Sequence, residues 1–155
     1  MVTVGSPAPV FQLPAKPGDM VDVGALFGKE KVVLLFFPLA FSSVCTAEMC
    51  HFRDSWAQWE SVGAKVFAIS IDSPFVVNKF REAERIPFPV LSDFNKTVAP
   101  TYGALHADLM GLKGVTKRAA FVVGRDGKVA YAWVSENPGV QVDFDAVREA
   151  VRKAP

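Results

Sequence analysis

The sequence has few cysteines, little net charge and no long apolar run. Cysteine fills 2 of 155 positions, too few for a scaffold held together by disulfides. Its 17 basic and 16 acidic residues leave a net charge of +1, which gives no hint of binding to nucleic acid or to an anionic membrane. The most apolar run, residues 32–41, contains a proline and is far shorter than the roughly 20 residues that cross a bilayer. We therefore expect a soluble globular protein.

The N-terminus lacks the basic stretch followed by an apolar stretch that marks a signal peptide. The length of 155 residues suits one domain, residues 1–155, with a core of its own. We therefore expect a cytoplasmic protein whose thiols are normally kept reduced. In that compartment a close pair of thiols is more often catalytic or metal-binding than structural.

The two cysteines, Cys45 and Cys50, lie close together where an apolar run gives way to an amphipathic segment. Cys45, Met49, Phe52 and Trp56 follow one another at steps of four, three and four, which predicts one apolar face of a helix over about 44–59. A helix N-terminus favours the charged thiolate form of a cysteine. The segment therefore predicts a redox site.

The remaining pattern predicts an α/β protein. Continuous apolar runs predict buried strands at 31–37, 66–71 and 118–123, and a turn at 124–127 predicts that 128–134 pairs back on the last of these. Further elements are expected as an N-terminal hairpin within 1–30, a helix from Pro74, a short strand at 88–91, a weak helix at 95–102, a loop at 103–117 and a helix at 143–153. Without 1–30 and 87–117 the order is β-α-β-α-β-β-α, which resembles the thioredoxin fold: a central mixed sheet flanked by helices.

A thiolate that attacks a peroxide needs hydrogen-bond donors, a nearby cation and little water. We expect donors from the N–H groups of Thr46 and Ala47 in the first helical turn and from the hydroxyl of Ser42 in the approaching loop. Pro38 would shield the site. The cation is expected from Arg118, because it opens an otherwise apolar strand where a buried guanidinium needs an anionic partner.

Pro38-x-x-x-Ser42-x-x-Cys45 resembles the signature of the peroxiredoxin family, and Arg118 before the apolar run 119–123 resembles that family's late-strand arginine. The segment 45–54 is similar to the Q-type group, also called bacterioferritin comigratory protein. The segment 36–41 looks more like the alkyl hydroperoxide reductase E type. The resemblance covers nearly the whole chain and implies a thiol-dependent peroxidase that reduces hydrogen peroxide and organic hydroperoxides without cofactor or metal.

The resemblance also implies a role for each matching residue. Cys45 would be the peroxidatic thiolate that becomes a sulfenic acid, and Pro38 would shield it. Ser42, in place of the more usual threonine, would contact the peroxide. Arg118 would favour the thiolate and the leaving oxygen, and Glu48 would order the arginine. The chain departs from the pattern in two places, with Val44 where the Q-type group usually has glycine and Gly124 where an acid often follows the late strand.

Cys50 matches the resolving cysteine of the Q-type group, which would form a disulfide with Cys45. On an ideal helix the two Cα atoms would be about 8.7 Å apart, whereas disulfides rarely tolerate more than about 7 Å. The pair can therefore join only if the first turns of the helix unwind. The disulfide would then pass to a thioredoxin-like or glutaredoxin-like reductant. A monomer and a homodimer are both compatible with the sequence.

Other interpretations remain open at this point. Cys50 could be a packing residue in a one-cysteine peroxidase, or the chain could be a disulfide oxidoreductase or a redox sensor on the same fold. Three of the site residues also have a simpler explanation. Ser42 could serve merely as the helix cap, Glu48 could be there merely because the helix dipole favours an acid in the first turn, and Arg118 could lie in solvent. A zinc site with His51 or His106 is disfavoured, because the cysteine spacing is not that of known ligand sets.

Overall fold

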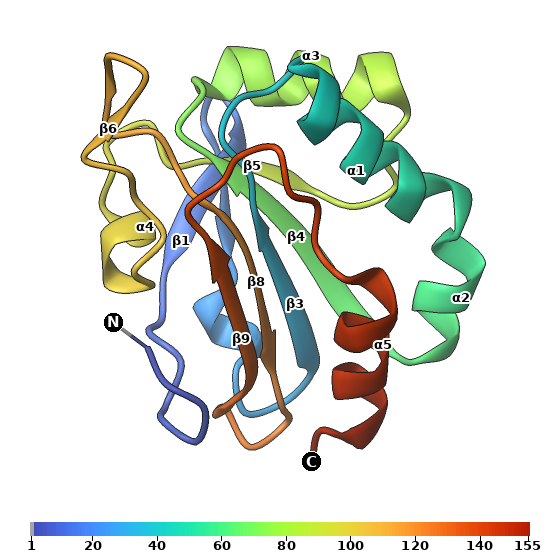
Figure 1. Ribbon diagram of the computed structural model, residues 1–155. Coiled ribbons are helices and arrows are strands. Elements are labelled where there is room, and N and C mark those ends of the chain that lie inside the picture. The colour runs from blue at the N-terminus through green and yellow to red at the C-terminus, as the bar shows by residue number, and fades with distance from the viewer. Residues whose placement is uncertain (1) are drawn as a thin grey trace.

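The fold is built on a five-stranded sheet with strand order β5-β4-β3-β8-β9 (Figure 1), seen in a computed structural model that describes residues 2–155. β3, β4 and β5 run parallel, and β8 pairs antiparallel with both β3 and β9. This is the expected mixed sheet. The strands are β3 (Lys31–Phe36), β4 (Ala64–Ser70), β5 (Val90–Ser92), β8 (Arg118–Val123) and β9 (Val129–Ser135).

The central strands are apolar throughout because both faces of the sheet are covered. Along β3, Val33 and Leu35 enter one core, whereas Val32, Leu34 and Phe36 enter the core on the opposite face. This alternation follows from the two-residue period of a strand. All six residues of β3 and all six of β8 are buried, which fits their continuous apolar runs.

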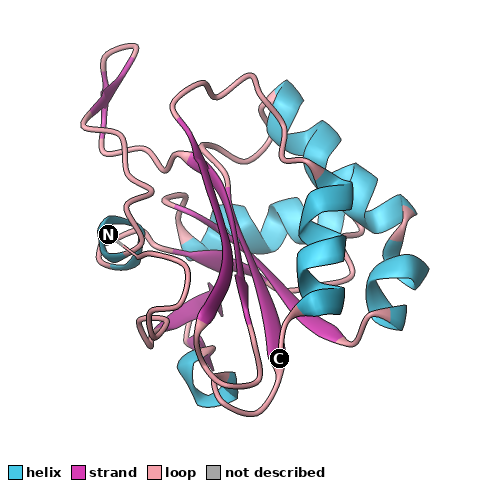
Figure 2. Ribbon diagram, turned by 60° about the horizontal axis from the view of Figure 1, so that its bottom comes forward, coloured by secondary structure: helices cyan, strands magenta, loops and turns pink. Residues whose placement is uncertain are grey.

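The longer helices gather on one face of the sheet (Figure 2). The N-terminal hairpin, a 3-10 turn and a short helix supply the core on the other face. The first group is α1 (Ser43–Asp54), α2 (Trp56–Ser61), α3 (Pro74–Glu84) and α5 (Phe144–Lys153). The second group is β1 (Gln12–Lys16), β2 (Asp19–Asp22), η1 (Gly24–Leu26) and α4 (Val98–Thr101).

Three expected elements differ in detail. The helix expected over about 44–59 is broken at Ser55, whose hydroxyl donates to the carbonyl of His51 and whose ψ of 20° interrupts the helical path. The helix expected at 95–102 is only the single turn of α4. The expected loop 103–117 contains a small hairpin, β6 (Asp108–Leu109) and β7 (Leu112–Lys113).

Sheet topology brings distant segments to one edge. β3 leads through residues 37–42 into α1, so the start of α1 lies just beyond the end of that strand. β8 runs antiparallel to β3, and its Ala119 pairs with Phe36 at the end of β3. Arg118 therefore lies beside the start of α1. Among residues 2–155, no helix has the length and apolar character needed to span a bilayer.

Candidate active site

Cys45 is the third residue of α1, and its side chain faces the guanidinium of Arg118. The Nη2 of Arg118 donates to the sulfur of Cys45 across 2.9 Å. Both side chains are almost completely buried, each 1% exposed. The alternative that Arg118 lies in solvent is therefore wrong. The guanidinium therefore brings a positive charge and a hydrogen-bond donor into direct contact with the sulfur.

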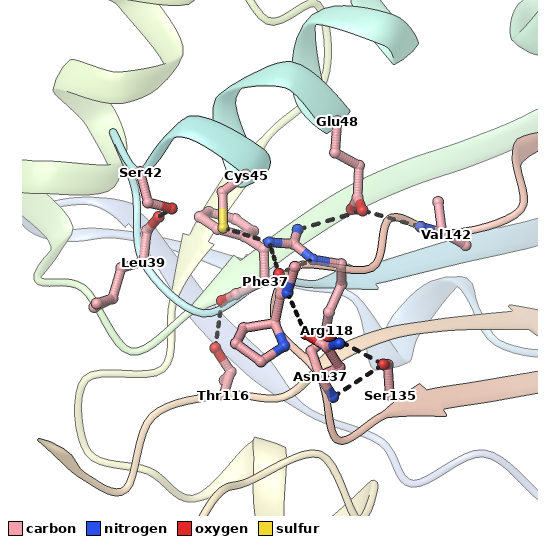
Figure 3. A network of polar contacts seen from close by, with 12 residues as sticks. Phe37, Leu39, Ser42, Cys45, Glu48, Thr116, Arg118, Ser135, Asn137 and Val142 are labelled. Atoms are coloured by element: carbon pink, nitrogen blue, oxygen red, sulfur yellow. Dashed lines mark hydrogen bonds and ion pairs between the residues drawn. The ribbon is translucent and has the colours of Figure 1, made fainter. Parts of the chain in front are cut away.

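The guanidinium of Arg118 is held on three sides (Figure 3). Its Nη1 lies 3.3 Å from Oε2 of Glu48. Its Nε and Nη2 donate to the carbonyl of Pro138 at 3.2 and 3.1 Å. Because these contacts fix the plane of the guanidinium, Nη2 has little freedom to turn away from Cys45.

Glu48 lies in the second turn of α1 and is completely buried. Its Oε2 also accepts from the N–H of Val142 at 3.2 Å, whereas its Oε1 has no hydrogen-bond partner within residues 2–155. Burial raises the pKa of Glu48 above its usual value, although the charge of Arg118 and the Val142 N–H oppose the rise. The helix dipole alone does not explain this residue, because its carboxylate is directed at Arg118.

Two residues that the sequence did not point to hold the loop before α1. The hydroxyl of Thr116 donates to the carbonyl of Phe37, next to the buried Pro38. The Oδ2 of Asp72 accepts from the N–H of Ala40 at 2.7 Å and from the hydroxyl of Ser70 at 2.7 Å. No local pattern could reveal either contact, because each joins segments that are distant in the sequence.

Ser42 stands directly before α1 but does not cap it with its side chain. Its hydroxyl donates to the carbonyl of Leu39 at 2.7 Å, which leaves the oxygen lone pairs available as acceptors. The N–H of Thr46 donates to the carbonyl of Ser42 at 2.9 Å as part of the helix. The expectation that Thr46 offers a free N–H beside Cys45 is therefore wrong, because that donor is already used.

A pocket of about 220 Å³ leads to Cys45. Ser42 and Arg118 contribute to its polar part, and the hairpin β6–β7 contributes two residues from the opposite side. Cys45 is only 1% exposed, yet it is one of the residues that line this pocket. Its apolar lining consists of Pro38, Leu39, Val44, Leu109, Met110 and Pro138.

Cys50 lies near the other end of α1, and both cysteines are free thiols in an intact helix. The Cys50 thiol donates to Oε2 of Glu84, at the end of α3, over 3.6 Å. Arg53 donates from Nη1 to the carbonyl of Glu84 at 2.8 Å. Burial raises the pKa of the Cys50 thiol, and the carboxylate of Glu84 adds to the rise while Arg53 opposes it.

Comparison with known proteins gives a consistent result. The AhpC/TSA family matches residues 4–132. The protein named "Putative peroxiredoxin bcp" of Coxiella burnetii is 37% identical over 145 residues, 92% of each chain. Alkyl hydroperoxide reductase E of Mycobacterium tuberculosis is 32% identical over 141 residues, 90% of this chain and 89% of that one. The crystal structure of the peroxidoxin BcpB from M. tuberculosis superimposes with a TM-score of 0.86 at 33% identity, covering 98% of this chain and 97% of that one.

The α/β architecture of this chain agrees with that of the solved relative. The match spans most of the chain, and two of the relatives exceed 30% identity over about nine-tenths of their length. This chain therefore belongs to the AhpC/TSA family and is a peroxiredoxin, a peroxidase that reduces peroxides with a thiol.

Proposed function

We propose that Cys45 is the thiol that reacts with peroxide. Its thiolate attacks one oxygen of the hydroperoxide, the O–O bond breaks, and the sulfur becomes a sulfenic acid. The other oxygen leaves as hydroxide or alkoxide and takes up a proton to become water or an alcohol. The observation that carries this proposal is the 2.9 Å contact between the Arg118 guanidinium and the Cys45 sulfur.

The surrounding residues then have distinct tasks. Arg118 favours the thiolate and stabilises the charge that develops on the leaving oxygen. Glu48 orients Arg118 through their contact at 3.3 Å. Pro38, which is buried, limits water around the sulfur, and Ser42 in the same pocket contacts the bound peroxide through its oxygen.

Cys50 is proposed as the resolving thiol. It attacks the sulfur of the Cys45 sulfenic acid, a disulfide forms and the hydroxyl leaves as water. Both cysteines belong to one continuous helix, in which residues at this spacing are about 8.7 Å apart between Cα atoms. Because disulfides rarely tolerate more than about 7 Å, the helix must unwind, and the contacts of Cys50 and Arg53 with Glu84 must break.

The cycle is completed by a reductant of the thioredoxin or glutaredoxin class, which exchanges its dithiol for the Cys45–Cys50 disulfide. We place this activity in the cytoplasm, where such reductants keep thiols reduced. We also propose that residues 1–155 act as one domain, since the site combines side chains from β8 and α1 with backbone groups from the segment before α5.

The test combines mass spectrometry with circular dichroism after one equivalent of peroxide. We expect a loss of two hydrogens, a Cys45–Cys50 linkage in the digest and a decrease in helix content. The Cys50→Ser variant should stop at the sulfenic acid and keep its helix content, and Cys45→Ser should not react. A disulfide with unchanged helix content would refute unwinding. Oxidation of Cys45 without any disulfide would make this a one-cysteine enzyme.

A further inference from the structure

We propose that the tip of the β6–β7 hairpin, Leu109 and Met110, makes this enzyme selective for hydroperoxides that carry a bulky apolar group. The inference rests on the proposed role of Cys45, because it concerns which substrates reach that sulfur. It adds two specificity-determining residues from a segment that contributes nothing to the contacts of Arg118 or Glu48. The hairpin extends from the body of the molecule at β6 (Figure 1).

Met110 occupies a position that is unfavourable for folding. Its side chain is 86% exposed, the largest fraction among the exposed large apolar side chains of the described residues. Its φ of 52° lies in the left-handed region, which favours asparagine or glycine in a two-residue turn of this kind. A methionine at this position buries little apolar surface and adopts a backbone conformation that suits asparagine or glycine better. The stability of the free protein therefore does not explain why a methionine stands there.

The hairpin is nevertheless well fixed. Oδ1 of Asp108 accepts from the N–H of Gly111 at 2.7 Å, and Oδ2 accepts from Nζ of Lys113 at 2.5 Å. Nζ of Lys96, from the segment between β5 and α4, donates to the carbonyl of Lys113 at 3.0 Å. These bonds hold Leu109 and Met110 in place at the rim of the pocket that contains Cys45.

The size and the lining of the pocket both indicate an organic substrate. A water molecule takes up about 30 Å³ in the liquid, so hydrogen peroxide would fill only a small part of a pocket of about 220 Å³. With the peroxide group at Cys45 and Arg118, a carbon chain or ring would extend toward Leu109 and Met110. Burial of apolar surface there stabilises the bound organic hydroperoxide and leaves hydrogen peroxide unaffected. The product is the corresponding alcohol.

The exposed tip could instead serve as a contact for the reducing protein. The two possibilities differ in the step that they affect. A substrate-selecting tip alters the oxidation of Cys45 by peroxide, whereas a docking surface alters only the later reduction of the disulfide. We favour substrate selection because Leu109 and Met110 line the pocket that contains the sulfur.

The test measures the rate of Cys45 oxidation by rapid mixing, acid quench and mass spectrometry, with cumene hydroperoxide and with hydrogen peroxide. The variants are Met110→Asn, which suits the left-handed turn and therefore preserves the hairpin, and Leu109→Thr. Leu112→Thr is the matched control, because Leu112 lies on the same hairpin, is 48% exposed and does not line the pocket.

We expect Met110→Asn to lower the rate with cumene hydroperoxide about tenfold, the effect of losing part of one buried apolar contact. The rate with hydrogen peroxide should stay within twofold, and Leu112→Thr should leave both rates unchanged. An equal change with both peroxides, no change with either, or an effect confined to reduction by thioredoxin would overturn the inference. If no peroxide oxidised Cys45 in the unmodified enzyme, the proposed function itself would fail instead.

Discussion

Arg118 donates a hydrogen bond to the sulfur of Cys45 across 2.9 Å, although 73 positions separate the two residues in the chain. The antiparallel pairing of β3 and β8 accounts for this contact, because it places the start of β8 beside the end of β3. The same guanidinium also contacts Glu48 in the next turn of α1. One cation thus faces both a sulfur and a carboxylate on one helix, inside the protein.

Replacing Arg118 with methionine should slow the oxidation of Cys45 by peroxide about 10- to 100-fold, since a hydrogen bond to a charged group contributes about 1.5–3 kcal/mol. Arg118→Lys should lie between this variant and the unmodified enzyme, because an ammonium cannot contact sulfur, Glu48 and Pro138 in the same fork geometry. The exposed Arg125, just beyond β8, gives the control Arg125→Met. Equal rates in Arg118→Met and the control would contradict the prediction.

Glu48 is predicted to act through Arg118. Glu48→Gln keeps an acceptor for Arg118 and Val142 and should lower the oxidation rate less than tenfold. Glu48→Ala removes that acceptor, frees the guanidinium to turn and should lower the rate about 10- to 100-fold. Second-order rates with hydrogen peroxide, measured alongside melting temperatures, check this. If Glu48→Ala melted earlier but reacted at the normal rate, Glu48 would only support the fold.

Glu84 should influence the reactivity of Cys50. Burial raises the pKa of the Cys50 thiol and the carboxylate of Glu84 adds to the rise, so Glu84→Gln should lower that pKa part of the way toward the ordinary value for cysteine. In a Cys45→Ser background the alkylation of Cys50 should then increase at a lower pH than in the Cys45→Ser protein with Glu84 intact. The measurement is the pH dependence of the iodoacetamide reaction rate. Glu82→Gln, on the exposed side of α3, is the control and should not shift the curve.

We predict that His106 makes the protein less stable in mild acid. Burial lowers the pKa of His106 below its usual 6.5, and its Nε2 has no partner within residues 2–155. The unfolded chain therefore binds a proton more readily than the folded one, so stability is retained above about pH 6.5 and decreases as the pH falls below it. Urea unfolding should show that the free energy of unfolding decreases less between pH 7 and pH 5 in His106→Gln than in the unmodified protein. An identical decrease in both proteins would exclude His106 as the cause.

The fold and the helix that carries Cys45 could be predicted from the sequence because they depend on short-range patterns. Continuous apolar runs marked β3 and β8, and the spacing around Cys45 marked α1. The break at Ser55 has no signal in the sequence, because Trp56 continues the same apolar spacing across it. The β6–β7 hairpin has only a weak signal in the sequence, because its turn, Met110-Gly111, lacks the asparagine or aspartate that usually marks such turns.

The supporting contacts of the site could not be predicted for a different reason. Asp72 binds the N–H of Ala40 across 32 positions, and Thr116 binds the carbonyl of Phe37 across 79. Neither residue stands in a pattern of its own, so only the folded arrangement identifies them. Glu48 is intermediate: the family resemblance implied that it orders Arg118, but its burial and its contact with Val142 depend on the segment before α5.

The long separation between Cys45 and its cation has a consequence for protein synthesis. At the ribosome, the sulfur emerges well before Arg118, by roughly 4–15 seconds at ordinary elongation rates. Pro138, whose carbonyl holds the guanidinium, emerges later still. A nascent or misfolded chain therefore carries the Cys45 thiol without the guanidinium beside it, and the contact between them forms only once the polypeptide has been completed through that point and has folded.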